Sequence, residues 1–144
     1  MGKMRKASYI GSIVVGVLLI LGGLTTWIIV SNTLSDQNIN VADDASCLAG
    51  DRVDGPFSAY CQAKIIEEHA LHATGGKYYS ELAQDDPLRA VAAQSAYLQA
   101  SLYTSVVAFG TAGMAILVGA LFVMIGLGMK DVAERVVPMS DTDS

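Results

Sequence analysis

Charged residues are scarce in this chain. Asp, Glu, Lys and Arg make up 16% of its 144 residues, whereas a typical soluble domain has about 25%. Apolar residues make up 52%, and they gather in two runs without any charge, over 9–30 and 102–129. Because about 20 residues of helix cross a bilayer core, each run is long enough to span a membrane. The composition therefore excludes an ordinary small soluble domain.

Cysteine and histidine are rarer still, with two of each. Cys47 and Cys61 lie too far apart for a Cys-x-x-Cys redox motif or for the close ligand pair of a structural zinc site. Neither apolar run contains an ionisable Asp, Glu, Lys, Arg or His, which argues against a proton relay or ion pathway within this chain. We therefore expect no enzymatic activity and no cofactor.

Basic residues flank the two runs on one side only. They are Lys3, Arg5 and Lys6 before the first run and Lys130 and Arg135 after the second. The positive-inside rule then places 1–8 and the acidic tail 130–144 in the cytoplasm, and 31–101 outside it. The first run is longer than the roughly 7–15 apolar residues of a cleaved signal peptide, so we expect it to remain as an anchor. The last residues, 138–144, are expected to be disordered.

The connecting segment 31–101 is acidic, with ten Asp and Glu against four Lys and Arg. This net negative charge argues against nucleic acid as a partner. Thiols oxidise outside the cytoplasm, so Cys47 and Cys61 are expected to form a disulfide. In the chain-entropy model a loop of this size stabilises a fold by about 3 kcal/mol, which matters for a segment with so small a core.

Two helices are expected in the connecting segment, after an extended loop over 31–51. The first covers 56–73, because Pro56 suits a first helical position and Thr74-Gly75-Gly76 is typical of a helix end. The second begins at Asp86-Pro87, where Asp86 is the expected N-cap. No Gly or Pro interrupts the sequence from there into the second run. We therefore expect one continuous helix from 87 through the span 102–129.

Small residues recur at helical spacing in both parts of the chain. Along 56–73 they and one isoleucine form a stripe that would let another backbone approach: Ala59, Ala63, Ile66, Ala70 and Ala73. In the spans they are expected to pack the two helices together: Ser12, Gly16, Gly23, Ser105, Ala108, Ala112, Ala115 and Gly119. Further glycines could leave a surface for another protein: Gly110, Gly113, Gly126 and Gly128.

The strongest metal candidates are Glu68, His69 and His72. Glu68 and His72 are four residues apart, and the two histidines are three apart, so all three could share one side of a helix. The pattern is not His-Glu-x-x-His, and the chain has no third histidine. A solvated helix surface is the favoured interpretation, and a metal-binding site is the alternative.

Several short stretches resemble a family of short actinobacterial two-pass membrane proteins, whose members often carry the label aromatic ring-opening dioxygenase. The stretches are GPFSAY at 55–60, HA at 69–70, GGK at 75–77, SEL at 80–82 and LYTSVVAFG at 102–110. The resemblance covers nearly all of the chain except its tail, and implies two spans in a bacterial plasma membrane. A ring-opening dioxygenase needs iron held by two histidines and a carboxylate in an enclosed pocket. Only Glu68, His69 and His72 could supply that set, so the activity is not carried over.

We therefore expect an all-α membrane protein: an antiparallel two-helix transmembrane hairpin with a small, helical, disulfide-stapled extracytoplasmic domain. Its expected role is that of a non-catalytic accessory or assembly subunit of a larger bacterial membrane complex, such as a respiratory or cell-envelope complex. Its expected partners are membrane lipids and another integral membrane protein. The alternative is a stand-alone envelope sensor or metal-binding module that uses Glu68, His69 and His72.

Overall fold

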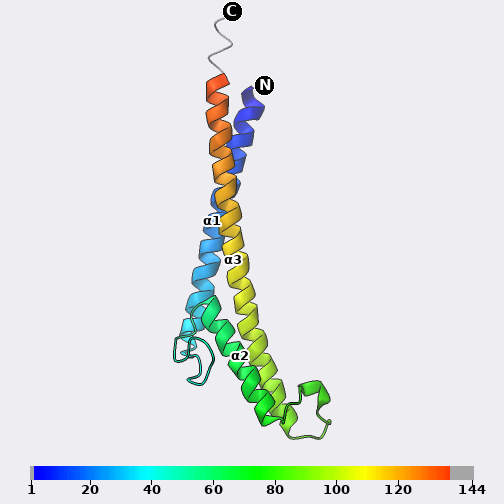
Figure 1. The fold of residues 1–144 in the computed structure, drawn as a ribbon. Helices are drawn as coiled ribbons and strands as arrows, with labels where there is room; N and C mark the ends of the chain where they lie inside the picture. The colour runs from blue at the N-terminus through cyan, green and yellow to red at the C-terminus, as the bar shows by residue number, and fades with distance from the viewer. Residues whose placement is uncertain (1, 137–144) are drawn as a thin grey trace, which may run out of the picture. The chain divides into compact units, whose positions relative to one another are not determined.

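The computed structural model describes residues 2–136. They form three α-helices and one 3-10 turn, in the order α1 (Gly2–Asp36), α2 (Pro56–Ala73), η1 (Tyr79–Glu81) and α3 (Leu88–Val136) (Figure 1). Within this range no strand is present, and an antiparallel bridge joins Asn40 to Arg52. The all-α prediction is confirmed. The segment 138–144, for which we expected disorder, lies outside the described residues.

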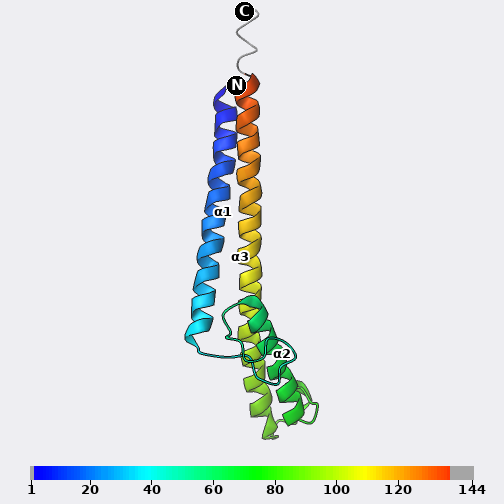
Figure 2. The same ribbon diagram turned by 60° about the vertical axis from the view of Figure 1, so that its left-hand side comes forward.

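The chain divides into two compact units. Among the described residues, the helix-pair unit covers 2–26 and 111–136, and the stapled unit covers Trp27–Gly110. In the helix-pair unit, α1 and α3 are antiparallel and lie side by side in both views (Figures 1 and 2).

Glycine lets the two backbones of the helix-pair unit touch. A Cβ atom added at Gly16 would lie 2.6 Å from the carbonyl oxygen of Gly119, and one added at Gly119 would lie 2.6 Å from that of Gly16. A Cβ at Gly23 would lie 2.6 Å from the carbonyl oxygen of Ala112. Nearby, the Ser12 hydroxyl donates to the carbonyl of Phe122 across 2.7 Å. These positions form a seam in which only small residues fit.

The seam repeats every seven residues, at 16 and 23 in α1 and at 112, 119 and 126 in α3. All five of these residues are buried. This spacing keeps one face of each helix toward the other, as in a left-handed coiled coil. Gly126, which we had considered as surface for another protein, belongs to the seam, whereas Gly110 and Gly128 face open space.

Both long helices extend beyond the apolar runs. The loop predicted over 31–51 begins later, because α1 continues to Asp36. Leu34 is buried in the core of the stapled unit, and the Arg52 guanidinium donates to the carbonyl of Ser35 across 2.8 Å. These contacts hold the last turn of α1 in helical form, and Asn38 follows it with a φ of 50°.

α2 begins and ends where the sequence signals lie, and α3 begins at its predicted start but continues beyond the predicted end at 129, to Val136. The Ser58 hydroxyl accepts from the backbone N–H groups of Asp54 and Gly55, each across 3.2 Å. At the end of α2, Gly76 has a φ of 84° and its N–H donates to the carbonyl of Leu71 across 2.7 Å, which is a typical glycine stop. Asp86 caps α3 as predicted, since its Oδ1 accepts from the N–H of Leu88 at 2.9 Å.

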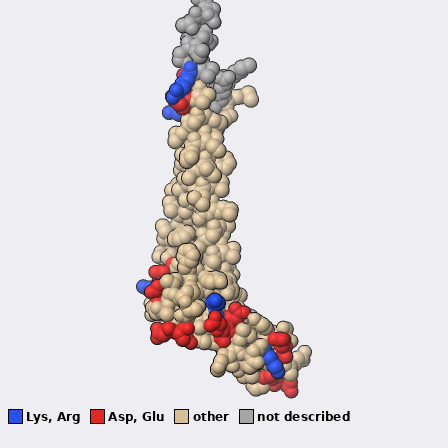
Figure 3. All heavy atoms as spheres, in the orientation of Figure 1, with Lys and Arg blue, Asp and Glu red and all other residues tan. Residues whose placement is uncertain are grey.

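Both α1 and α3 contain a stretch long and apolar enough to cross a membrane, within Lys6–Asp36 and Leu88–Arg135. The most apolar parts of these stretches are only 11% and 17% buried. On the face shown in Figure 3, carboxylates gather over the stapled unit, and Lys, Arg, Asp and Glu colour the helix-pair unit only near its end. Large apolar side chains such as Leu18, Leu117 and Met124 are exposed.

Candidate functional site

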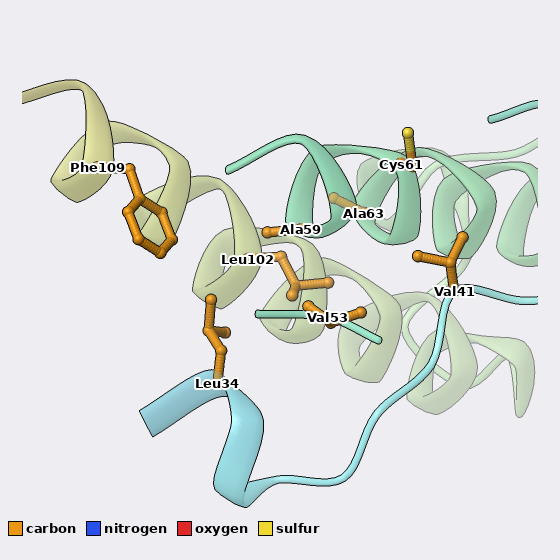
Figure 4. Close-up of a cluster of buried hydrophobic side chains, with 8 residues drawn as sticks. All are labelled: Leu34, Val41, Val53, Ala59, Cys61, Ala63, Leu102 and Phe109. Atoms are coloured by element: carbon orange, nitrogen blue, oxygen red, sulfur yellow. The ribbon is translucent and has the colours of Figure 1, made fainter. Parts of the chain in front are cut away.

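The stapled unit is built around one core, to which α1, the loop after it, α2 and α3 all contribute (Figure 4). Its buried members are Leu34, Val41, Val53, Ala59, Cys61, Ala63, Leu102 and Phe109. Trp27 closes one end, where its ring meets the Phe109 ring edge-on with centroids 4.8 Å apart. The core fixes one face of α2 on α3.

The predicted disulfide between Cys47 and Cys61 is present, with the two Cα atoms 5.8 Å apart. It joins the loop after α1 to a buried position on α2. The same loop is also held by backbone pairs, since the N–H of Val41 donates to Asp51 at 2.8 Å and that of Val53 donates to Ile39 at 2.9 Å. The disulfide therefore reinforces a loop that is already ordered by hydrogen bonds.

The predicted stripe on α2 contacts the core through part of its length. Ala59 and Ala63 are fully buried, and Ile66 packs against the core from a partly buried position. Ala70 is half-buried and Ala73 is exposed, so the stripe loses contact toward the C-terminal end of α2.

The predicted span residues Ser105 and Ala108 fall in the stapled unit and are half-buried, as is Ala115 in the helix-pair unit.

The three metal candidates are not brought together. His69 Nε2 lies 2.6 Å from Asp44 Oδ2, where an imidazole N–H donates to the carboxylate. This hydrogen bond lowers the pKa of Asp44. Glu68 and His72 are exposed, and within 2–136 no group of three or more His, Cys, Asp or Glu side chains could hold a metal ion. Sequence reasoning missed Asp44, because no local spacing relates it to position 69.

A groove of about 270 Å³ runs between the C-terminal half of α2, the segment 77–80 and the start of α3. Its floor includes Ser95, a buried residue whose hydroxyl accepts from the Gln99 side chain across 2.9 Å. At its rim the Tyr78 hydroxyl donates to Glu67 across 3.2 Å, which raises the pKa of the Tyr78 phenol. The groove thus offers aromatic, small and amide groups for contact.

A cation–aromatic pair holds the segment between α2 and α3. The Arg89 guanidinium lies 4.0 Å from the centroid of the Tyr79 ring, and it donates to the carbonyl of Leu82 across 2.7 Å. Arg89 therefore positions the Tyr79 ring and the backbone at Leu82.

Comparison of the chain with protein-family models, curated proteins and solved structures finds no match.

Proposed function

We propose that this chain is a two-pass membrane protein whose stapled unit lies outside the cytoplasm. The observation that carries the proposal is the exposure of the two apolar helices, of which only 11% and 17% are buried in their most apolar parts. A core helix of a soluble protein buries most of such a stretch, since exposed apolar surface costs about 25 cal/mol per Å² in water. A bilayer removes that cost without any further protein contact.

Charge and chemistry support the proposed orientation. The basic residues Lys6 and Lys130 lie at the ends of the apolar runs that would face the cytoplasm. The disulfide between Cys47 and Cys61 would lie on the opposite side, where the environment is oxidising. The resemblance to two-pass actinobacterial membrane proteins supports the same arrangement.

Within the membrane we propose a non-catalytic role, as an accessory or assembly subunit of a larger bacterial membrane complex. Cys47 and Cys61 form a disulfide, and His69 is hydrogen-bonded to Asp44. We therefore assign these side chains structural roles. Tyr78, Tyr79 and Tyr97 of the stapled unit are exposed. Tyrosine is enriched in protein interfaces, which fits a domain that binds a neighbouring subunit.

Gentle purification tests this role. A tagged chain solubilised from its native membrane in mild detergent is expected to bring down at least one integral membrane protein in fixed stoichiometry. The same preparation dissolved first in a denaturing detergent is the control, and it should yield the chain alone. Elution of the chain alone from the mild detergent, after cross-linking in the intact membrane has also failed to capture a partner, would contradict the accessory-subunit proposal.

A further inference from the structure

Phe57 is the most exposed aromatic side chain of the stapled unit, at 77%. It lies in the first turn of α2, one residue after Pro56. Tyr60, one turn further along, is half-exposed, and its ring lies 6.1 Å from that of Tyr103 on α3. The core does not include either side chain, since its buried residues from α2 are Ala59, Cys61 and Ala63.

The first turn of α2 lies level with the ends of both apolar runs. Tyr60 is beside Tyr103, one residue after the run in α3 begins at Leu102. Ser31 is the first residue after the apolar run in α1, and its hydroxyl donates to the carbonyl of Asp54 across 2.7 Å. Two independent contacts thus place the start of α2 at the same level.

The direction of α2 places Phe57 on the apolar side of Tyr60. The C-terminal part of α2 lies near the start of α3, because Ala70 and Val91 line the same hollow, whereas Tyr60 lies beside Tyr103. α2 and this part of α3 are therefore antiparallel, so residues earlier in α2 lie beside residues later in α3, toward its apolar run. Phe57 lies about one helical turn from Tyr60 along the α2 axis, on the side of the apolar run.

We propose that the first turn of α2 inserts into the outer interface of the membrane, with Phe57 in the acyl region and Tyr60 at the headgroups. This inference rests on the proposed membrane function. Aromatic side chains favour this zone, because their rings are apolar while a tyrosine hydroxyl still reaches water. Trp27 and Tyr103 lie at the same end of the two apolar runs, so four aromatic residues would form one interfacial belt.

Tryptophan fluorescence tests the insertion. The only tryptophan, Trp27, is replaced by phenylalanine, and Phe57→Trp is added so that the probe sits at the first turn of α2. The matched control carries Tyr97→Trp in the same background, because Tyr97 is also an aromatic residue with 75% exposure but lies six residues before Tyr103. Each full-length variant is placed as a single copy in a lipid nanodisc, with and without brominated acyl chains.

The probe at position 57 is expected to emit at shorter wavelength than the probe at 97, to be quenched several-fold more by brominated lipid, and to be quenched several-fold less by aqueous acrylamide. Equal responses of the two probes, or a blue emission at 57 that brominated lipid leaves unchanged, would overturn the insertion. Alkaline carbonate washing of membranes separates this result from the parent proposal. A chain that resists extraction while probe 57 remains in water refutes the insertion alone, and a chain released by carbonate refutes membrane integration itself.

Discussion

Replacing Gly119 by alanine is expected to weaken the pairing of α1 and α3 by about 1–3 kcal/mol, the usual cost of overpacking. The new methyl group would lie 2.6 Å from the carbonyl oxygen of Gly16 and 2.8 Å from the Ile20 side chain. A backbone oxygen cannot rotate away, so the two helices must separate. The effect is measurable as a lower midpoint for unfolding of the full-length protein by a denaturing detergent.

Gly128→Ala is the matched control on the same helix. A Cβ at Gly128 meets nothing within 4 Å, and alanine favours helix over glycine by up to about 1 kcal/mol. We therefore expect the control to leave the midpoint unchanged or to raise it. If Gly119→Ala and Gly128→Ala shift the midpoint equally, the seam does not hold the two helices together.

Removing the disulfide is expected to destabilise the stapled unit by about 3 kcal/mol. Cys47 and Cys61 are replaced together by alanine, which avoids placing a hydroxyl at the buried position 61. The lost crosslink lets the unfolded chain expand, and the segment 37–55 then depends on its backbone hydrogen bonds alone. Limited proteolysis should cut this segment much faster in the variant than in the oxidised protein.

Reduction of the unmodified protein provides the control, because it breaks the same bond without changing any side-chain packing elsewhere. Reduced protein and the double variant should be cleaved at similar rates. A double variant that resists protease as well as the oxidised protein would mean that the hydrogen bonds of the loop suffice, and that the disulfide adds no stability.

The local signals in the sequence predicted where α2 begins and ends and where α3 begins. Pro56, Asp86 and the pair Gly75-Gly76 act within one turn of the chain, so their effect can be read from neighbouring residues. The disulfide was also predictable, because Cys47 and Cys61 are the two cysteines of the chain and both lie in the segment expected outside the cytoplasm. These predictions needed no knowledge of long-range packing.

Contacts between distant segments account for what sequence reasoning missed. The last turn of α1 is helical although its sequence is polar, because Leu34 enters the core and Arg52 binds the carbonyl of Ser35. His69 pairs with Asp44, 25 residues earlier, rather than with Glu68 or His72. No periodicity within a single helix encodes either contact.

The glycine seam lies between these cases. Spacing alone predicted that Gly16, Gly23 and Gly119 face another helix, but the register that joins position 16 to 119 follows from the antiparallel pairing of two helices far apart in the sequence. Phe57 is the opposite case. Its place in a predicted helix was clear, whereas its exposure beside the apolar runs could be seen only once α2 was placed against α3.

The central claim, that the stapled unit lies outside the cytoplasm between two membrane spans, is tested most directly by reporter fusions. A reporter that is active only after export is inserted near Gln84, in the exposed segment before α3, or attached after Val137. We predict activity for the fusion at Gln84 and none for the fusion after Val137. Activity after Val137 with none at Gln84, or activity at both positions, would contradict the two-span arrangement.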